Sequence, residues 1–161
     1  MGSNAERQAL IDELGRFPGE LEALVGSLSP EQLAGPFIPG EWSVAQNVHH
    51  LVDSHINSYV RCKLMATEES PTFRPYDEKR WAALPDGRSA SIAVSMTLLR
   101  SLHARWVLFW QSLDEEGWQR VGHHPDSGAV TLEDQLRLYV AHGAAHLAQI
   151  QRVLAAQATR A

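Results

Sequence analysis

Two histidines four residues apart, His142 and His146, have the type and spacing to bind one metal ion. In a helix, four residues make about one turn, so both imidazoles project from the same face and can converge. Neutral imidazole is a good ligand for zinc, nickel, copper and iron. The intervening residues are Gly-Ala-Ala, so the pair lacks the glutamate that serves as general base in the His-Glu-x-x-His motif of zinc proteases.

The pair alone does not establish a metal site. The chain has 8 histidines in 161 residues, and at that frequency roughly 0.4 such pairs arise by chance. A third ligand could be His49, His50 or His55, which share one segment of helical periodicity. His55 falls on the apolar stripe, as a hydrogen-bonded core histidine would. His50 lies on the same polar helix face as Asp53 and Asn57. Either of these side chains could hydrogen-bond to a metal-binding histidine and orient it. Periodicity does not choose among the three.

The remaining histidines and the tryptophans give weaker signals. His123 and His124 stand in a turn beside Pro125, where they are either exposed or face the mouth of a pocket. His103 has no partner that the sequence identifies. The tryptophans are expected to be packing groups, at positions 42, 81, 106, 110 and 118.

The elements that must position these residues are predicted to be helices, because apolar residues recur at spacings of three, four and seven. Ser43 with Gln46, and Thr131 with Asp134, have the spacing of capping boxes at helix starts. Pro18 should kink or split the first helix near residue 17. The predicted helices cover residues 6–28, a short stretch from residue 30, 43–65, a short stretch at 76–84, 89–113, and a last helix from residue 131.

Four long helices with short connections predict an all-α fold, a four-helix bundle. Residues 123–128 have turn chemistry, which favours a short hairpin before the last helix. No linker divides the chain, so we expect a single domain over residues 1–161. Residues 1–5 (MGSNA) are treated as a disordered or cloning-derived leader and excluded from functional arguments.

Composition excludes several classes of protein. The net charge is −5, without the basic excess typical of nucleic-acid binders. No run of about 18 apolar residues is present, so no membrane span is expected. Cys62 is the only cysteine and cannot form an internal disulfide, which is consistent with the cytoplasmic location that we expect.

Several segments, in order, resemble the DinB superfamily and in particular its YfiT-like branch. The resemblance extends from the first predicted helix to Val153. It rests on residues 40–44 (GEWSV), 48–59 (VHHLVDSHINSY), 74–78 (RPYDE), 102–106 (LHARW), 124–125 (HP) and 139–146 (YVAHGAAH).

The resemblance implies a four-helix bundle that holds one divalent metal ion per chain, zinc or nickel, through three histidines. One ligand comes from the second long helix and two from the last. The position before Leu51 matches the first ligand, which selects His50, and the other two fall on His142 and His146. The branch often has further histidines between the last two ligands. Their absence here puts any role of such histidines in substrate handling in doubt.

The YfiT-like branch is similar to bacillithiol S-transferases and to proteins earlier described as metal-dependent hydrolases, and its members are usually homodimers. Three neutral imidazoles leave the ion its full charge and an open position, which can hold an anionic nucleophile. We therefore expect an enzyme that transfers a low-molecular-weight, bacillithiol-like thiol to an electrophilic substrate. The alternatives are a metal-dependent hydrolase using the same site and a non-catalytic dimeric metal-binding stress protein. The sequence identifies no general base, and Cys62, on an apolar stripe, is not expected to be the nucleophile.

Overall fold

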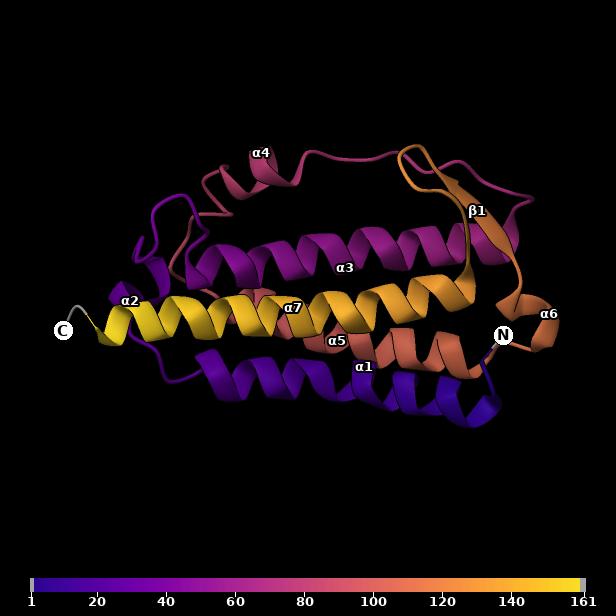
Figure 1. The fold of residues 1–161 in the computed structure, drawn as a ribbon, viewed down its shortest axis with the longest axis horizontal. Helices are drawn as coiled ribbons and strands as arrows, with labels where there is room; N and C mark the ends of the chain where they lie inside the picture. The colour runs from indigo at the N-terminus through magenta and orange to yellow at the C-terminus, as the bar shows by residue number, and fades with distance from the viewer. Residues whose placement is uncertain (1, 160–161) are drawn as a thin grey trace.

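Four long helices dominate the computed structural model, which describes residues 2–159. They are α1 (Asn4–Val25), α3 (Val44–Thr67), α5 (Ala93–Gln111) and α7 (Leu132–Ala158), and they run side by side along the molecule (Figure 1). α1 and α3 each pack against both α5 and α7, so α1 lies diagonally across the bundle from α3. The predicted all-α four-helix bundle is confirmed.

Short elements connect the long helices. They are α2 (Pro30–Ala34), α4 (Glu78–Ala82), α6 (Glu115–Trp118), β1 (Val121–His124) and β2 (Gly128–Thr131). The two strands form the predicted hairpin, antiparallel, with Val121 paired to Thr131, and β2 leads directly into α7. The single turn α6, capped by the Asp114 side chain, was not predicted. The segment that carries α4 passes outside α3 (Figure 1).

Capping boxes begin the helices where the sequence predicts them and also at the N-terminus. The Ser43 and Thr131 side chains each accept a hydrogen bond from the backbone three residues on. Ser3 caps α1 in the same way, and the helix begins at Asn4. Residues 3–5 therefore form the ordered start of α1, while Met1 lies outside the described residues.

Pro18 lies inside α1 without ending it. The helix runs from Asn4 to Val25, so Pro18 does not split it; a split was one of the two predicted effects, and a kink was the other. Phe17 and Pro18 are both buried against the bundle, and tertiary packing of a helix face outweighs one missing backbone hydrogen bond.

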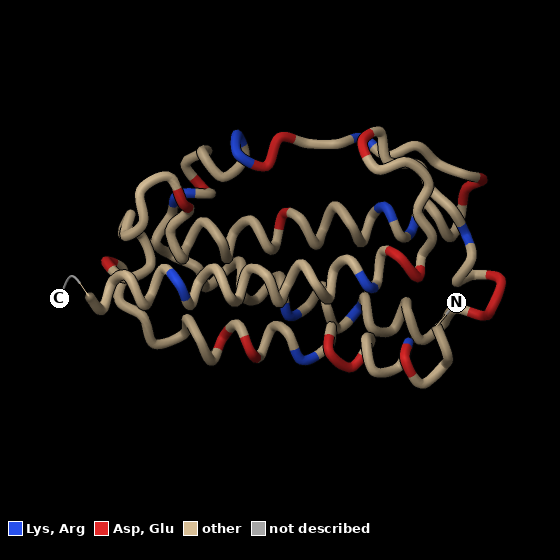
Figure 2. The backbone as a smooth tube through the Cα atoms, in the orientation of Figure 1, with Lys and Arg blue, Asp and Glu red and all other residues tan. Residues whose placement is uncertain are grey.

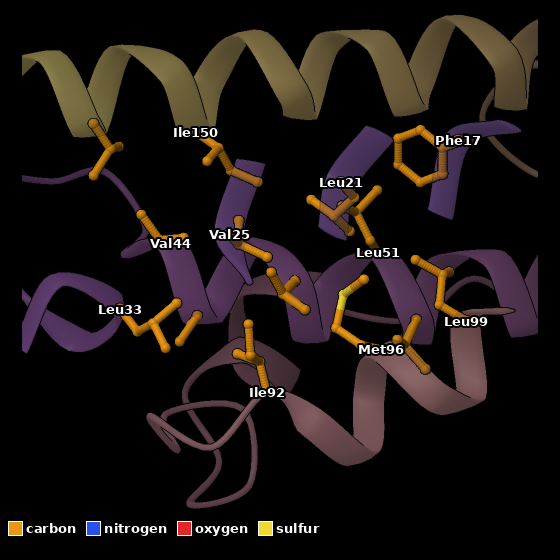
Figure 3. Packing of buried hydrophobic residues seen from close by; sticks show 14 residues of the cluster. Phe17, Leu21, Val25, Leu33, Val44, Leu51, Ile92, Met96, Leu99 and Ile150 are labelled. Atoms are coloured by element: carbon orange, nitrogen blue, oxygen red, sulfur yellow. The ribbon is translucent and has the colours of Figure 1, made fainter. Parts of the chain in front are cut away.

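The apolar core consists of two clusters separated by a layer of histidines. One cluster, shown in Figure 3, includes Leu21, Val44 and Ile150. The other lies toward the hairpin and includes Trp106 and Leu136. Along α3, α5 and α7, histidines occupy the positions between the two clusters. Within residues 2–159, no helix is long and apolar enough to cross a membrane.

Candidate metal centre

His50, His142 and His146 come together in the middle of the bundle, and we call them the triad. Their ligand nitrogens all lie within 4.8 Å of one another, and Nε2 of His50 is 3.4 Å from Nε2 of His142. Nitrogen ligands about 2.0–2.1 Å from a tetrahedral zinc ion are about 3.3–3.4 Å apart. The arrangement therefore fits a metal ion with only small side-chain movements.

α7 presents its two histidines as the spacing predicts. The rings of His142 and His146 lie on one face, with their centroids 4.5 Å apart. On α3, the residue that joins them is His50 rather than either of its neighbours. The His49 ring points toward α5, where Nδ1 lies 2.8 Å from Oγ of Ser95.

A hydrogen bond to the side-chain amide of Asn47 orients the ring of His146. Nδ2 of Asn47 donates to the Ser43 carbonyl at 3.0 Å, which directs Oδ1 toward His146. Nδ1 of His146 lies 2.8 Å from that Oδ1, and an amide oxygen only accepts, so Nδ1 is the donor. The Nε2 lone pair is left for a metal ion.

His142 is supported by another imidazole, that of His55, whose Nε2 lies 3.3 Å from Nδ1 of His142. The sequence had suggested Asp53 or Asn57 for such a supporting role, and this prediction is wrong. Asn57 donates to the Asp53 carbonyl on its own helix, and among residues 2–159 neither side chain bonds to the triad. Burial and the Asp86 charge raise the pKa of Asp53.

Burial keeps the triad neutral at physiological pH. Burial, with a smaller contribution from His146, lowers the pKa of His50 to about 4. Burial and the two neighbouring imidazoles lower the pKa of His142 to about 3, and burial also lowers the pKa of His146. Residues 138–151 of α7 contain no Lys, Arg, Asp or Glu (Figure 2). Neutral imidazoles are the form that binds metal.

Trp42 forms one wall of the site, and its role was missed in the sequence. Its ring lies 4.6 Å from that of His50 and stacks on His146 at 6.3 Å with an interplanar angle of 13°. Its position directly before the Ser43 cap of the ligand-bearing helix was the available signal. Of the other tryptophans, three are buried as packing groups, at positions 106, 110 and 118, whereas Trp81 is exposed.

Glu78, in α4, is the carboxylate that reaches the triad, with Oε2 4.0 Å from Nε2 of His50. Its side chain is 54% exposed. α4 is attached to α3 by Gln46, whose Nε2 donates to the Ala82 carbonyl at 2.9 Å. Periodicity gave no signal for Glu78, because the contact depends on how the 68–92 connection crosses α3.

The hairpin histidines and the single cysteine lie outside the triad. His123 is exposed on β1, and His124 accepts a hydrogen bond from the Asp126 backbone within the turn. Neither belongs to the group of histidines that could hold an ion. Cys62 is fully buried, and burial raises the pKa of its thiol to about 12, so it is unsuited to act as a nucleophile.

Comparisons with known proteins identify the family of the chain. The DinB superfamily model matches residues 13–150. The proposed metal-dependent hydrolase YfiT of Bacillus subtilis (strain 168) is 42% identical over 149 residues, which cover 92% of this chain and 84% of YfiT. A proposed metal-dependent hydrolase of Bacillus cereus (strain AH820) is 44% identical over 140 residues, covering 87% of this chain and 80% of the relative.

The fold is similar as well. The solved structure of Bacillus subtilis YfiT, a probable metal-dependent hydrolase with an unusual four-helix bundle topology, matches with a TM-score of 0.91 and 41% identity. The match covers 95% of this chain and 88% of the other. Since sequence and fold agree over nearly the whole length, the chain belongs to the DinB superfamily and to its YfiT-like branch.

Proposed function

We propose that this protein is a metal-dependent hydrolase whose divalent ion, zinc or nickel, is held by His50, His142 and His146. The observation that carries the proposal is the convergence of three neutral imidazoles beside one free carboxylate, that of Glu78. Similarity to proposed metal-dependent hydrolases supports hydrolysis. It does so in preference to the thiol transfer that the sequence resemblance first suggested.

When bound, a divalent ion with three imidazole ligands has an open position and lowers the pKa of water toward neutrality. The chain's own residues handle the proton and the substrate. Glu78, 4.0 Å from His50 and on a flexible stem, is placed to accept a proton at Oε2 as general base. Trp42 covers His50 and His146 on one side, excludes water there and offers an apolar wall to a substrate.

The first test is an assay of the zinc- or nickel-loaded protein on a panel of chromogenic esters, with and without an added small thiol. We expect hydrolysis that a chelator and His142→Ala both abolish. If product forms only as a thiol conjugate, the hydrolase proposal fails in favour of S-transfer. If metal is bound but nothing turns over, it fails in favour of a non-catalytic metal-binding protein.

The second test concerns the base. Glu78→Gln should lower kcat by about 10²- to 10⁴-fold, the usual contribution of general-base catalysis, while metal content is retained. Glu116→Gln, an exposed carboxylate on α6, is the matched control. Equal kcat values for the two variants would remove Glu78 from the mechanism.

Elemental analysis tests the ligand assignment directly. His50→Ala should lose the metal, and His49→Ala should retain it. Full metal occupancy in His50→Ala would show that this ligand is wrongly assigned. The homodimer implied by the family resemblance stays a prediction, for which sedimentation velocity is the measurement.

A further inference from the structure

A buried row of three imidazoles leads from the triad to the backbone of α1, and we call His142, His55 and His103 the histidine row. Nδ1 of His142 lies 3.3 Å from Nε2 of His55. Nδ1 of His55 lies 2.8 Å from Nε2 of His103, and Nδ1 of His103 lies 2.7 Å from the carbonyl oxygen of Leu14. The row therefore links all four long helices.

The row ends on a carbonyl that α1 cannot satisfy by itself. In an α-helix the N–H of residue 18 would donate to the carbonyl of residue 14. Residue 18 is proline, which has no N–H. The His103 ring supplies the missing donor, and a buried carbonyl without a donor would be costly. Pro18 thus leaves Leu14 free to accept from a side chain.

This carbonyl determines the position of every proton in the row. A carbonyl oxygen only accepts, so His103 carries its proton on Nδ1, and its Nε2 must accept. His55 then donates from Nδ1 and accepts at Nε2 by the same logic. His142, in turn, donates from Nδ1. Among residues 2–159, no carboxylate pairs with His55 or His103, so both rings stay neutral in their buried setting.

We propose that the histidine row, anchored on the Leu14 carbonyl, fixes His142 as the Nδ1–H tautomer, so that its Nε2 lone pair is presented to the metal ion. His55 and His103 do not belong to the triad and act through His142 as positioning residues. A hydrogen bond to the far nitrogen of a ligand histidine fixes its ring and strengthens it as a ligand. The inference rests on the metal site proposed above.

Aromatic side chains enclose the row and hold its rings in place. Phe17 stacks on His103 with the centroids 5.5 Å apart and lies 5.6 Å from His55. Trp106 and Tyr139 meet His55 edge-on at 5.8 and 5.1 Å. Water therefore has little access to compete for the ring nitrogens.

The first test reads the tautomers in metal-free protein labelled with 15N-histidine. Long-range ¹H–¹⁵N correlation spectra distinguish Nδ1–H from Nε2–H rings by chemical shift. We expect Nδ1–H on all three rings of the row. An Nε2–H tautomer on His55 or His103 overturns the proposal, whether or not the protein binds metal.

The second test measures Zn²⁺ affinity by competition with a chromogenic chelator. His55→Leu should bind Zn²⁺ about 10- to 100-fold more weakly, the usual effect of losing such a supporting bond. His55→Gln should recover most of this loss, because its amide oxygen can accept from His142. His49→Leu, which also removes two part-buried hydrogen bonds from α3, is the matched control and should bind Zn²⁺ normally.

The outcomes separate the two proposals. Unchanged affinity in His55→Leu, or an equal loss in His49→Leu, overturns the role of the row. Should His55→Leu fail to fold, a full loss of affinity in His55→Gln would equally contradict the proposal. If the unmodified protein takes up neither Zn²⁺ nor Ni²⁺, the proposed function fails, and the tautomer spectra still decide whether the row is ordered as inferred.

Discussion

Gly143 lies between the two histidines of α7, and replacing it with alanine is expected to disturb both the bundle and the metal centre. The added methyl group would lie 2.8 Å from Cε2 and 2.9 Å from Cδ2 of Phe17. The Phe17 ring is buried and packs against His55 and His103. It therefore cannot move aside without displacing the histidine row.

Two opposing contributions determine how much Gly143→Ala changes the free energy of unfolding. Alanine is favoured over glycine in a helix by about 1 kcal/mol. An extra methyl group in a packed core costs about 1–3 kcal/mol, and the upper part of that range applies because the ring packs on the histidine row. Gly143→Ala should therefore lower the free energy of unfolding by about 1–2 kcal/mol, which corresponds to a fall in Tm of roughly 3–6 °C.

Urea denaturation of the chelator-treated proteins measures this change. Gly19→Ala is the matched control, since its methyl group would meet nothing within 4 Å and it should be neutral or stabilising. If Gly143→Ala stabilises the protein as much as Gly19→Ala does, Phe17 is not held where the structure places it, and the reasoning is refuted.

Asn47→Ala removes the acceptor for His146 and should weaken Zn²⁺ binding about 10- to 100-fold. Asn57→Ala is the control in the same chelator competition, and an equal loss there would contradict the assignment. In metal-free protein, burial lowers the pKa values of the triad and the histidine row below the unfolded value of about 6.5. The unfolded chain then binds more protons below pH 6.5, so their contribution to stability is complete above that pH and falls as the pH drops toward 4. Urea midpoints measured from pH 7.5 to 5 should decline, and constant midpoints would argue against neutral buried rings. Arg7→Ala removes the partner of Glu133 Oε2 at 3.0 Å, while Oε1 keeps Arg137, and should cost about 2 kcal/mol; a loss below about 0.5 kcal/mol in urea unfolding would show that the pair contributes little.

Much of the fold and part of the site could be predicted from local sequence. Ser43 and Thr131 predict helix starts because a cap depends only on residues within one turn. The convergence of His142 and His146 is equally local, since residues four apart on a helix share a face whatever the helix packs against. Pro18 does not split α1, one of its two predicted effects, because burial of the helix face outweighs a single lost hydrogen bond.

Only the tertiary structure decided which side chains meet across the bundle. Periodicity left three histidines on α3 with equal claims, and the packing of α3 against α7 brings His50 to the triad while His55 joins the histidine row. Glu78 lies in α4, a short helix that the local sequence predicts, but its approach to His50 depends on how the connection between α3 and α5 crosses α3. The physical reason is that spacing along one helix determines which side chains share a face, whereas the rotation and order of the helices, set by burial of their apolar faces, determine which faces meet.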